Sequence, residues 1–422
     1  MLGSPGSSSY TSTSTSQEPL FLSESSRELR ELQQKTIPVV LIEGDGIGKE
    51  VSAATVQVIN HALSLSSDNA EIRWEKALAG KEALTQTGEL LPVETIESFL
   101  RHGAGLKGPL ETPVGGGFRS VNVALRKLLD LYANVRPVRS FEGLENPLRT
   151  ADQFRLVIIR ENTEDVYAGL EFEAGSPEAI RLAEFLDLKG KGLDENSALG
   201  IKPISERASR RIVAKGIEYA LANGLNRITL VHKGNIMKAT EGAFRDWGYD
   251  EAKQILGDRF LPWKEFHLGG KTIADGKILV QDRIADAMFQ DLILAPQNHQ
   301  VLVTMNLNGD YLSDAAAACV GGLGLAPGLN EGDKIRLAEA VHGTAPDIAG
   351  KGIANPSALL LSGVLLLRAL ELPDSAKRIE LALEENFSRG EVTGDLAYRH
   401  KNPHVLSTQA FADSLCQRID KS

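Results

Sequence analysis

Short apolar runs alternate with segments of helical spacing along most of the chain. Each run has the length of a strand, is rich in Val, Ile or Leu, and is followed by a loop and then by a segment of helical pattern. This alternation is typical of α/β proteins in which helices cover a largely parallel sheet. The four clearest runs are residues 37–42, 154–159, 227–231 and 300–305.

Three glycines, Gly44, Gly46 and Gly48, follow the first apolar run. A glycine turn between a strand and a helix belongs to the dinucleotide-binding fingerprint, but that fingerprint needs its third glycine at the sixth position, which is Lys49 here. We therefore expect a tight turn with positive φ angles, a helix from about Glu50, and no Rossmann fold.

Three other segments depart from the alternation. Between residues 171 and 204 the periodicity weakens and the charge rises, which indicates an inserted subdomain or an oligomer arm. Residues 358–367 are apolar and follow Asn355 and Pro356, a helix-start signal, so we expect a buried helix there. The chain start, to about residue 26, is rich in Ser, Thr and Gly and is predicted to be a disordered tail.

The composition excludes several function classes. With 46 basic and 56 acidic residues the formal charge is −10, which gives no support to nucleic-acid binding. No stretch reaches the roughly 18 apolar residues that a membrane span needs, so no membrane association is expected. Two cysteines, Cys319 and Cys416, are too few for a disulfide framework and fit a reducing, cytoplasmic location.

A candidate anion site follows the glycine-bearing loop at residues 107–117. The next segment is predicted to be helical, with Ser120 near its start and with Asn122 and Arg126 four residues apart on one face. Backbone N–H groups, a hydroxyl, an amide and a guanidinium together favour an anion. Ordinary helix capping and surface solvation are the alternative explanation for these residues.

Two further arginines belong to the same hypothesis. Arg160 directly follows a predicted strand, and the carboxyl ends of parallel strands are where α/β folds place their ligands. Arg136 lies shortly before it. Together with Arg126 they are predicted to clamp a di- or tricarboxylate through bidentate hydrogen bonds, although any one of them alone is typical of a surface ion pair.

Tyr167 and Lys233 are candidates for proton transfer. Tyr167 follows the arginine cluster, and its phenol can donate a proton; a packed tyrosine with a satisfied hydroxyl is the alternative. Lys233 stands at the end of another predicted strand, where a desolvated ammonium near carboxylates can take part in proton transfer. A solvated lysine at a strand end is the alternative there.

An acidic cluster indicates a metal site. Asp310 and Asp314 are four residues apart at the start of a predicted helix, so that both carboxylates face one ligand, and Asp286 is a possible third. Oxygen ligands suit Mg²⁺ or Mn²⁺, and the scarcity of His and Cys argues against zinc. A favourable charge near a helix N-terminus is the alternative for Asp314. Residues 342–356 then form a long polar loop whose pattern suits contact along a nucleotide.

In this order, these segments resemble the β-decarboxylating dehydrogenases, specifically the bacterial-type isocitrate dehydrogenases, from about Pro38 to the C-terminus. That resemblance implies a two-domain α/β fold, distinct from the Rossmann fold, with a clasp segment that helps to form a homodimer with shared active sites. The stretches that carry it are GPLETPVGGGFRSVNVALR, RENTEDVYAG, LVHKGNIMK, MNLNGDYLSDA and VHGTAPDIAG.

The domain limits implied by the resemblance place the tail at residues 1–30 and a clasp at 165–205. A large domain with the cofactor loop would comprise 31–131 and 321–422, and a small domain on the metal and dimer side 132–164 and 206–320.

Residue by residue, the resemblance implies roles for the candidates above. The catalytic pair would be Tyr167 and Lys233, and a neighbouring subunit would contribute Lys233 and Asp286 to each site. The substrate carboxylates would be held by Ser120, Asn122, Arg126, Arg136 and Arg160, and the metal by Asp286, Asp310 and Asp314. The nicotinamide would lie near Thr112, and the adenosine half would be held by His342, Gly343, Thr344, Ala345, Pro346, Asp347, Ile348 and Asn355.

The expected reaction is the metal-dependent oxidation and decarboxylation of isocitrate, as in the tricarboxylic acid cycle. The cofactor loop favours NAD over NADP, because Asp347-Ile348 replaces the Lys-Tyr of NADP-using members and Ala354 replaces their Val. A carboxylate at position 347 suits ribose hydroxyls and would repel a 2′-phosphate. The positions of their 2′-phosphate tyrosine and arginine match Gly394 and Tyr398 here.

Alternatives remain open at this point. An NADP-dependent isocitrate dehydrogenase and the 3-isopropylmalate, homoisocitrate and tartrate dehydrogenases share the metal aspartates and arginines, and Ser120 with Asn122 favours isocitrate. A non-catalytic regulatory subunit is disfavoured because the proton-transfer and metal residues are all present. Phosphorylation of Ser120 by a regulatory kinase would repel the substrate carboxylates.

Overall fold

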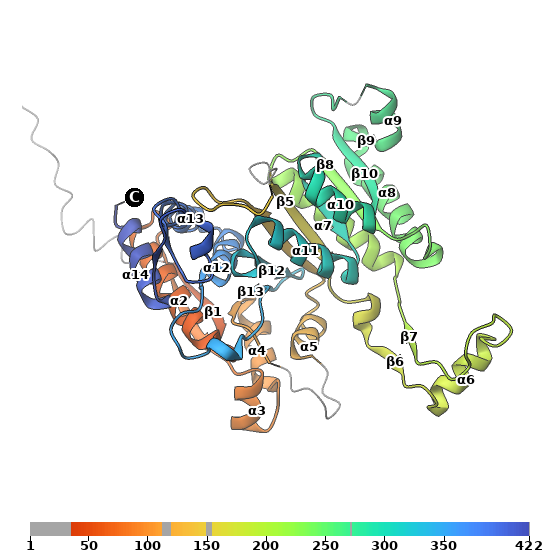
Figure 1. Ribbon diagram of the computed structural model, residues 1–422, viewed down its shortest axis with the longest axis horizontal. Helices are drawn as coiled ribbons and strands as arrows, with labels where there is room; N and C mark the ends of the chain where they lie inside the picture. Colours follow the sequence, from red (N-terminus) through yellow and green to blue (C-terminus); the bar gives the residue numbers. More distant parts are fainter. Residues whose placement is uncertain (1–34, 112–119, 149–153, 271, 422) are drawn as a thin grey trace, which may run out of the picture.

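One continuous sheet forms the centre of the computed structural model, which describes residues 35–111, 120–148, 154–270 and 272–421. The strands lie in the order β2-β1-β3-β13-β12-β4-β5-β11-β8-β10-β9 (Figure 1). Their bounds are β1 Lys35–Ile42, β2 Ala70–Lys76, β3 Ala104–Lys107, β4 Ala133–Arg139, β5 Arg155–Glu161, β8 Arg227–His232, β9 Phe260–Pro262, β10 Ile278–Ile284, β11 Val301–Thr304, β12 Pro327–Glu331 and β13 Arg336–Ala340.

The sheet is parallel towards both edges and antiparallel at its centre. Strand β12 runs antiparallel to both β13 and β4, and β4 runs antiparallel to β5. A short turn joins β12 to β13, and a connection of that length permits only an antiparallel pair. The predicted α/β class and its four strands are therefore confirmed, whereas the antiparallel centre is a feature that the apolar pattern does not reveal.

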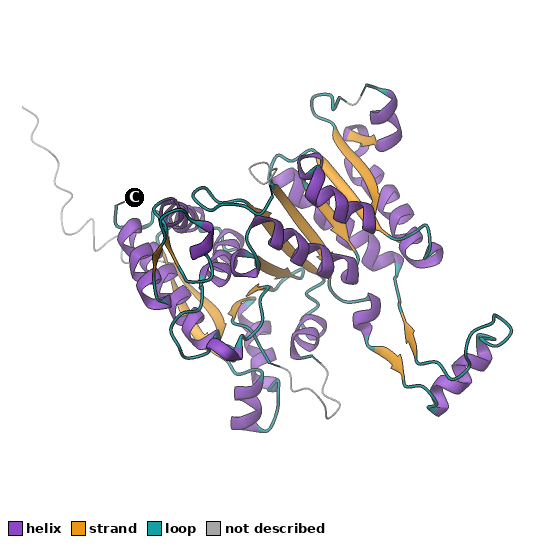
Figure 2. Cartoon of the chain, viewed as in Figure 1, coloured by secondary structure: helices purple, strands orange, loops and turns teal. Residues whose placement is uncertain are grey.

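Helices cover the faces of this sheet (Figure 2). Helix α12 is buried almost all round, as expected for the apolar run at residues 358–367; α2 and α13 pack beside it, and α14 packs against these two helices. The bounds are α2 Gly48–Leu65, α3 Lys81–Thr87, α4 Val93–His102, α5 Val121–Leu128, α6 Pro177–Phe185, α7 Glu206–Ala222, α8 Ala243–Leu256, α9 Trp263–Leu268, α10 Ala285–Leu294, α11 Asn306–Val320, α12 Ser357–Ala369, α13 Pro373–Ser388 and α14 Thr408–Ile419.

An arm projects from the body where the periodicity weakens. It consists of the antiparallel strands β6 (Leu170–Phe172) and β7 (Leu199–Ile201) with α6 between them, and it extends away from the large sheet (Figure 1). Several large apolar side chains lie exposed on it; Phe185 is 84% exposed and Leu193 is 57% exposed. The arm therefore has the build of an element that packs against something outside this single chain.

The glycine turn after β1 has the expected conformation. Gly44 and Gly46 have φ angles of 89° and 58°. A Cβ on Gly46 would lie 2.1 Å from the carbonyl oxygen of Thr344, which accepts a hydrogen bond from the backbone N–H of Ile47 at 2.9 Å. The turn thus packs directly against the loop after β13. Within the described ranges, no helix combines the length and apolar character that crossing a membrane requires.

Candidate active site

Two buried arginines lie on neighbouring central strands. Arg136 in β4 and Arg160 in β5 are 5% and 1% exposed. Arg160 donates from Nε and Nη2 to Oδ1 of Asn306, at 3.0 and 2.7 Å, at the start of α11. Arg136 donates from Nη1 to Oγ of Ser313 at 2.5 Å, one turn beyond Asp310 on the same helix. Helix α11 therefore covers both guanidinium groups.

Arg126 in α5 approaches the same region. Its Nη2 lies 2.7 Å from Oε1 of Glu339 in β13, and Nζ of Lys107 lies 2.8 Å from the other oxygen of that carboxylate. Lys107 and Glu339 were not identified from the sequence; the only signal available was a charged residue at or near the end of each of two short, largely apolar strands. Among the described residues, Nε of Arg126 and Oδ1 of Asn122 are buried without a hydrogen-bond partner.

The arginine cluster, by which we mean Arg126, Arg136 and Arg160, is short of negative charge. Burial, followed by repulsion from Arg160 and Arg126, lowers the pKa of Arg136 to about 9. Burial and then repulsion from Arg126 also lower the pKa of Arg160, and Asp310 offsets this only in part. Bringing a polyanion into the cluster would relieve this repulsion, and guanidinium groups bind carboxylates bidentately.

Asp310 and Asp314 lie beside these arginines on one face of α11. Oδ1 of Asp310 forms an ion pair with Arg160, and Nη1 of Arg136 lies 3.8 Å from Asp310 and 3.9 Å from Asp314. Burial raises the pKa of Asp314; Arg136 opposes this shift, and the neighbouring Asp310 adds to it. Asp314 therefore lies partly buried beside a second carboxylate, and a bound cation would stabilise the charged form of both.

Tyr167 lies within the same group, on the short 3-10 helix η2 (Asp165–Ala168). Its hydroxyl donates to Oδ2 of Asp310 at 2.5 Å, and the Arg160 guanidinium lies 5.0 Å from the centre of its ring. Burial, and then the hydrogen bond to Asp310, raise the pKa of Tyr167 to about 12. The phenol is therefore neutral at physiological pH, and it carries a proton next to the acids and arginines.

Lys233 and Asp286 form a separate pair. Lys233 follows β8, Asp286 lies at the start of α10, and Nζ is 2.6 Å from Oδ1. The hydrogen bond from Lys233 lowers the pKa of Asp286. Across the part of the chain that the structure describes, no three His, Cys, Asp or Glu side chains come together to hold a metal. One chain alone thus presents Asp310 with Asp314 in one place and Asp286 in another.

The predicted cofactor loop follows β13. Nδ1 of His342 donates to the carbonyl oxygen of Gly343 at 3.0 Å, Ala345 has a φ of 39°, and Asp347 is exposed on the 3-10 turn Pro346–Ile348. Asn355 is buried; its Nδ2 donates to Asp395 at 3.0 Å and its Oδ1 accepts from the backbone N–H of Ser357 at 2.9 Å. Thr112 lies outside the described residues.

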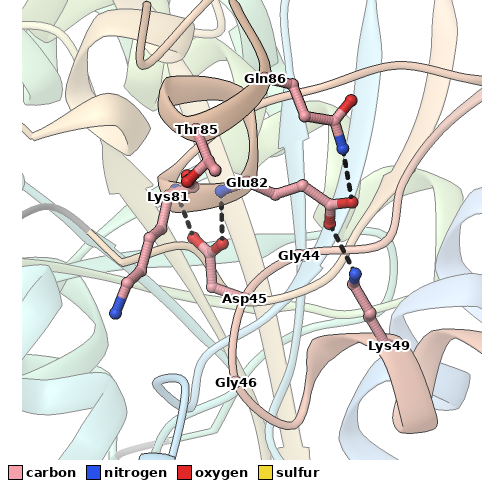
Figure 3. Close-up of a pocket in the computed structure, with 8 residues that line it drawn as sticks. All are labelled: Gly44, Asp45, Gly46, Lys49, Lys81, Glu82, Thr85 and Gln86. Atoms are coloured by element: carbon pink, nitrogen blue, oxygen red, sulfur yellow. Dashed lines mark hydrogen bonds and ion pairs between the residues drawn. The ribbon is translucent and has the colours of Figure 1, made fainter. Parts of the chain in front are cut away.

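A small pocket of about 360 Å³ lies beside the glycine turn (Figure 3). Its polar groups are engaged with one another: Asp45 accepts from the backbone N–H groups of Lys81 and Glu82, and Lys49 lies 3.0 Å from Glu82. Because these charges compensate one another, the pocket has no evident binding chemistry of its own. The arginine cluster with Asp310, Asp314 and Tyr167 is the better candidate site.

Comparisons with known proteins identify the family of the chain. The family model described as "Isocitrate/isopropylmalate dehydrogenase" matches residues 38–415. The chain is 47% identical to "Isocitrate dehydrogenase [NADP]" of Archaeoglobus fulgidus over 382 residues, covering 89% of this chain and 91% of that one. It is 44% identical to the protein of the same name from Haloferax volcanii over 410 residues, covering 95% and 96%.

A solved structure supports the same relationship. The crystal structure of isocitrate dehydrogenase from Methylococcus capsulatus superimposes with a TM-score of 0.76 at 39% identity, covering 91% of this chain and 99% of that one. The expected fold, distinct from a Rossmann fold, is thereby confirmed. The chain belongs to the isocitrate/isopropylmalate dehydrogenase family.

Proposed function

We propose that this protein oxidises and decarboxylates isocitrate with the help of a divalent cation and a nicotinamide dinucleotide. The observation that carries the proposal is the convergence of three arginines, two aspartates and a neutral tyrosine in one place. Three guanidinium groups short of negative charge suit a tricarboxylate. The names of the relatives point to the same substrate.

The donor atoms fit Mg²⁺ or Mn²⁺. Asp310 and Asp314 supply carboxylate oxygens from adjacent turns of one helix, and such oxygen donors are the ligands that these cations prefer. Asp286 of a second copy would complete the set. When bound, the cation would acidify the 2-hydroxyl of the substrate and stabilise negative charge that develops on its oxygen.

The proton-transfer roles follow from the protonation states. Lys233 of a second copy would assist removal of the proton from the 2-hydroxyl. Tyr167, whose phenol is neutral, would donate a proton to the carbon that loses its carboxylate. Ser120, Asn122 and the arginine cluster would hold the three carboxylates in register.

A homodimer with shared active sites accounts for the separation of Lys233 and Asp286 from Asp310 and Asp314. In this arrangement the arm, part of a clasp at residues 165–205, would join two copies. The cofactor domain would comprise residues 31–131 and 321–422, and the metal and dimer domain 132–164 and 206–320. Ser120, partly exposed at the start of α5, would be a point at which phosphorylation blocks substrate binding.

The choice of dinucleotide has one argument on each side. The names of the relatives favour NADP, and by similarity NADP is the better supported cofactor. The loop of this chain favours NAD, because the exposed Asp347 would repel a negatively charged 2′-phosphate and the side chain of Ile348 would offer it no hydrogen bond. Like charges in such a position cost on the order of several kcal/mol.

Steady-state kinetics with isocitrate and 3-isopropylmalate, each with NAD and with NADP, tests the substrate and the cofactor together. We expect kcat/KM to be highest with isocitrate, and we expect the activity to be lost when the metal is chelated. Higher activity with 3-isopropylmalate would contradict the proposed substrate. The same measurement shows which dinucleotide is preferred. If the loop decides this preference, Asp347→Lys should shift the ratio of the two kcat/KM values towards NADP.

A further inference from the structure

Lys202 lies between two fully buried carboxylates. Its Nζ is 2.8 Å from Oδ1 of Asp165 and 2.6 Å from Oε1 of Glu241, and both acids have 0% exposed side chains. These short distances make both contacts charge-assisted, and, against the opposing effect of its burial, the two carboxylates raise the pKa of Lys202. One ammonium thus compensates two buried negative charges. The desolvation of these three charged groups costs free energy, so such an arrangement indicates a functional or structural role.

The Asp165 side of this group fixes the Tyr167 turn and the start of α11. Asp165 has a φ of 70°, an unusual conformation for a residue other than glycine. Its Oδ1 also accepts from the backbone N–H of Val166 at 2.7 Å, and its Oδ2 accepts from that of Leu307 at 3.0 Å. Asp165 therefore joins the turn that carries Tyr167 to the helix that carries Asp310.

The Glu241 side fixes the backbone at Lys233. Oε2 of Glu241 accepts from the backbone N–H of Lys233 at 2.9 Å and from Nδ2 of Asn308 at 2.8 Å. The position of Lys233 thus depends on the carboxylate whose other oxygen contacts Lys202. Lys202 directly follows β7, so the arm positions the ammonium that contacts both Asp165 and Glu241.

We infer that Lys202 is a positioning residue for both proton-transfer groups, and that through it each subunit controls two active sites. The inference rests on the proposed function, in which Tyr167 serves the site of its own subunit and Lys233 serves the site of the second copy. The ion group of Asp165, Lys202 and Glu241 would then couple the two sites of the dimer.

The first test compares Lys202→Met, Lys202→Arg and the matched control Lys189→Met, which removes an 81% exposed lysine from the same arm. We expect Lys202→Met to lower kcat by about 100-fold, as small misplacements of catalytic groups do, with the KM for isocitrate little changed. Lys202→Arg should recover much of kcat because it keeps the charge, and Lys189→Met should match the wild type.

A purely structural role predicts a different result. Lys202→Met would then lower the melting temperature and the yield, while the folded enzyme would keep the wild-type kcat; that outcome overturns the inference. If Lys202→Met does not fold, Lys202→Met/Glu241→Gln removes one buried negative charge as well. Wild-type kcat in this double variant would overturn the inference too, and a lowered kcat at unchanged KM would support it.

Mixed dimers test the coupling. A dimer of one wild-type and one Tyr167→Phe subunit should keep about half of the activity, because only one site is damaged. A dimer of one wild-type and one Lys202→Met subunit should keep far less than half, because that subunit misplaces its own Tyr167 and the Lys233 that it lends. Half the activity in the second dimer would overturn the coupling.

One further mixed dimer separates this inference from the proposed function. Pairing a Tyr167→Phe subunit with a Lys233→Met subunit should restore about half of the activity if sites are shared, because one complete site re-forms. No recovery would show that the shared-site proposal fails, and the coupling with it. Recovery together with half activity in the Lys202→Met mixed dimer would refute the coupling alone.

Discussion

Arg136 illustrates how single residues prepare this site for its ligand. Its guanidinium is buried at the centre of the sheet, donates to Asn134 and Ser313, and lies near two other arginines. The folded protein therefore meets the desolvation cost of these cations before any substrate arrives. An incoming tricarboxylate would gain attraction without requiring the site to reorganise, which is the usual basis of strong electrostatic binding in a buried site.

Replacing Tyr167 by Phe tests the proton-donor role. We expect kcat to fall by about 100-fold or more, the usual contribution of general acid catalysis, while the KM for isocitrate stays near the wild-type value. Tyr249→Phe is a matched control, because the hydroxyl of Tyr249 also donates to a carboxylate, that of Asp282, at 2.8 Å. Wild-type turnover in Tyr167→Phe would remove Tyr167 from the acid role.

At the residue scale, chemical type and local position were enough to single out several groups of the site. They were not enough to identify the side chains that these groups contact. Arg126, Arg136, Arg160, Tyr167 and Asp310 could be singled out because each has a chemical type and position typical of a ligand site, and the structure brings them together. Lys107 and Glu339 could not, because their ion pair joins strands more than two hundred residues apart and no local spacing indicates it.

At the scale of elements, β3 and β13 are held together by charge as well as by backbone pairing. Lys107 and Glu339 are direct partners in the parallel register of the two strands, and Arg126 adds the contact from α5. Burial alone would raise the pKa of Glu339, but attraction by Lys107 and Arg126 outweighs it and holds that pKa well below its usual range. The carboxylate therefore fixes α5 to the sheet.

Glu339→Gln should destabilise the fold at neutral pH by about 3 kcal/mol, as breaking a buried ion pair does. Because the pKa of Glu339 is depressed in the folded state, its stabilisation is present above the unfolded pKa of about 4.3 and is lost as the pH falls through the folded value. Denaturant unfolding of the wild type and of Glu339→Gln should thus give free energies of unfolding that differ at pH 7 and differ less below pH 4. An unchanged difference would contradict this assignment.

Elements were predictable where the local pattern decides them. The runs at residues 37–42 and 227–231 agree with β1 and β8 within two residues at either end, because a strand buried on both faces must be apolar throughout. The antiparallel direction of β4 and β12 was missed. The direction and the neighbours of a strand depend on contacts between distant segments. The same apolar run can lie in a parallel or in an antiparallel sheet.

At the scale of the whole molecule, the arm is a part of the structure that exposes large apolar side chains in the single chain. Weak periodicity predicted its position between residues 171 and 204, but the sequence cannot show where a lone element packs. Its exposed apolar side chains, with Phe185 foremost, have the character of an interface core, where aromatic residues are enriched.

Phe185→Asp should therefore weaken the proposed dimer and lower activity with it. We expect a shift towards the monomer in light scattering, together with loss of turnover that recovers at high protein concentration. Leu268→Asp provides the control, because Leu268 is 77% exposed on α9, away from the arm. A Phe185→Asp enzyme that stays fully dimeric and active would exclude the arm residue from the interface.

The strand order also constrains how the chain folds during synthesis. Strands β12 and β13, from residues 327–340, fill the space between β3 and β4, which are complete some two hundred residues earlier. A growing chain on the ribosome therefore carries two unpaired strand edges for almost half of its translation, and such edges invite aggregation. Release of a truncated product that ends before residue 327 would leave both edges open, so this protein should depend on chaperone binding until its last quarter has been made.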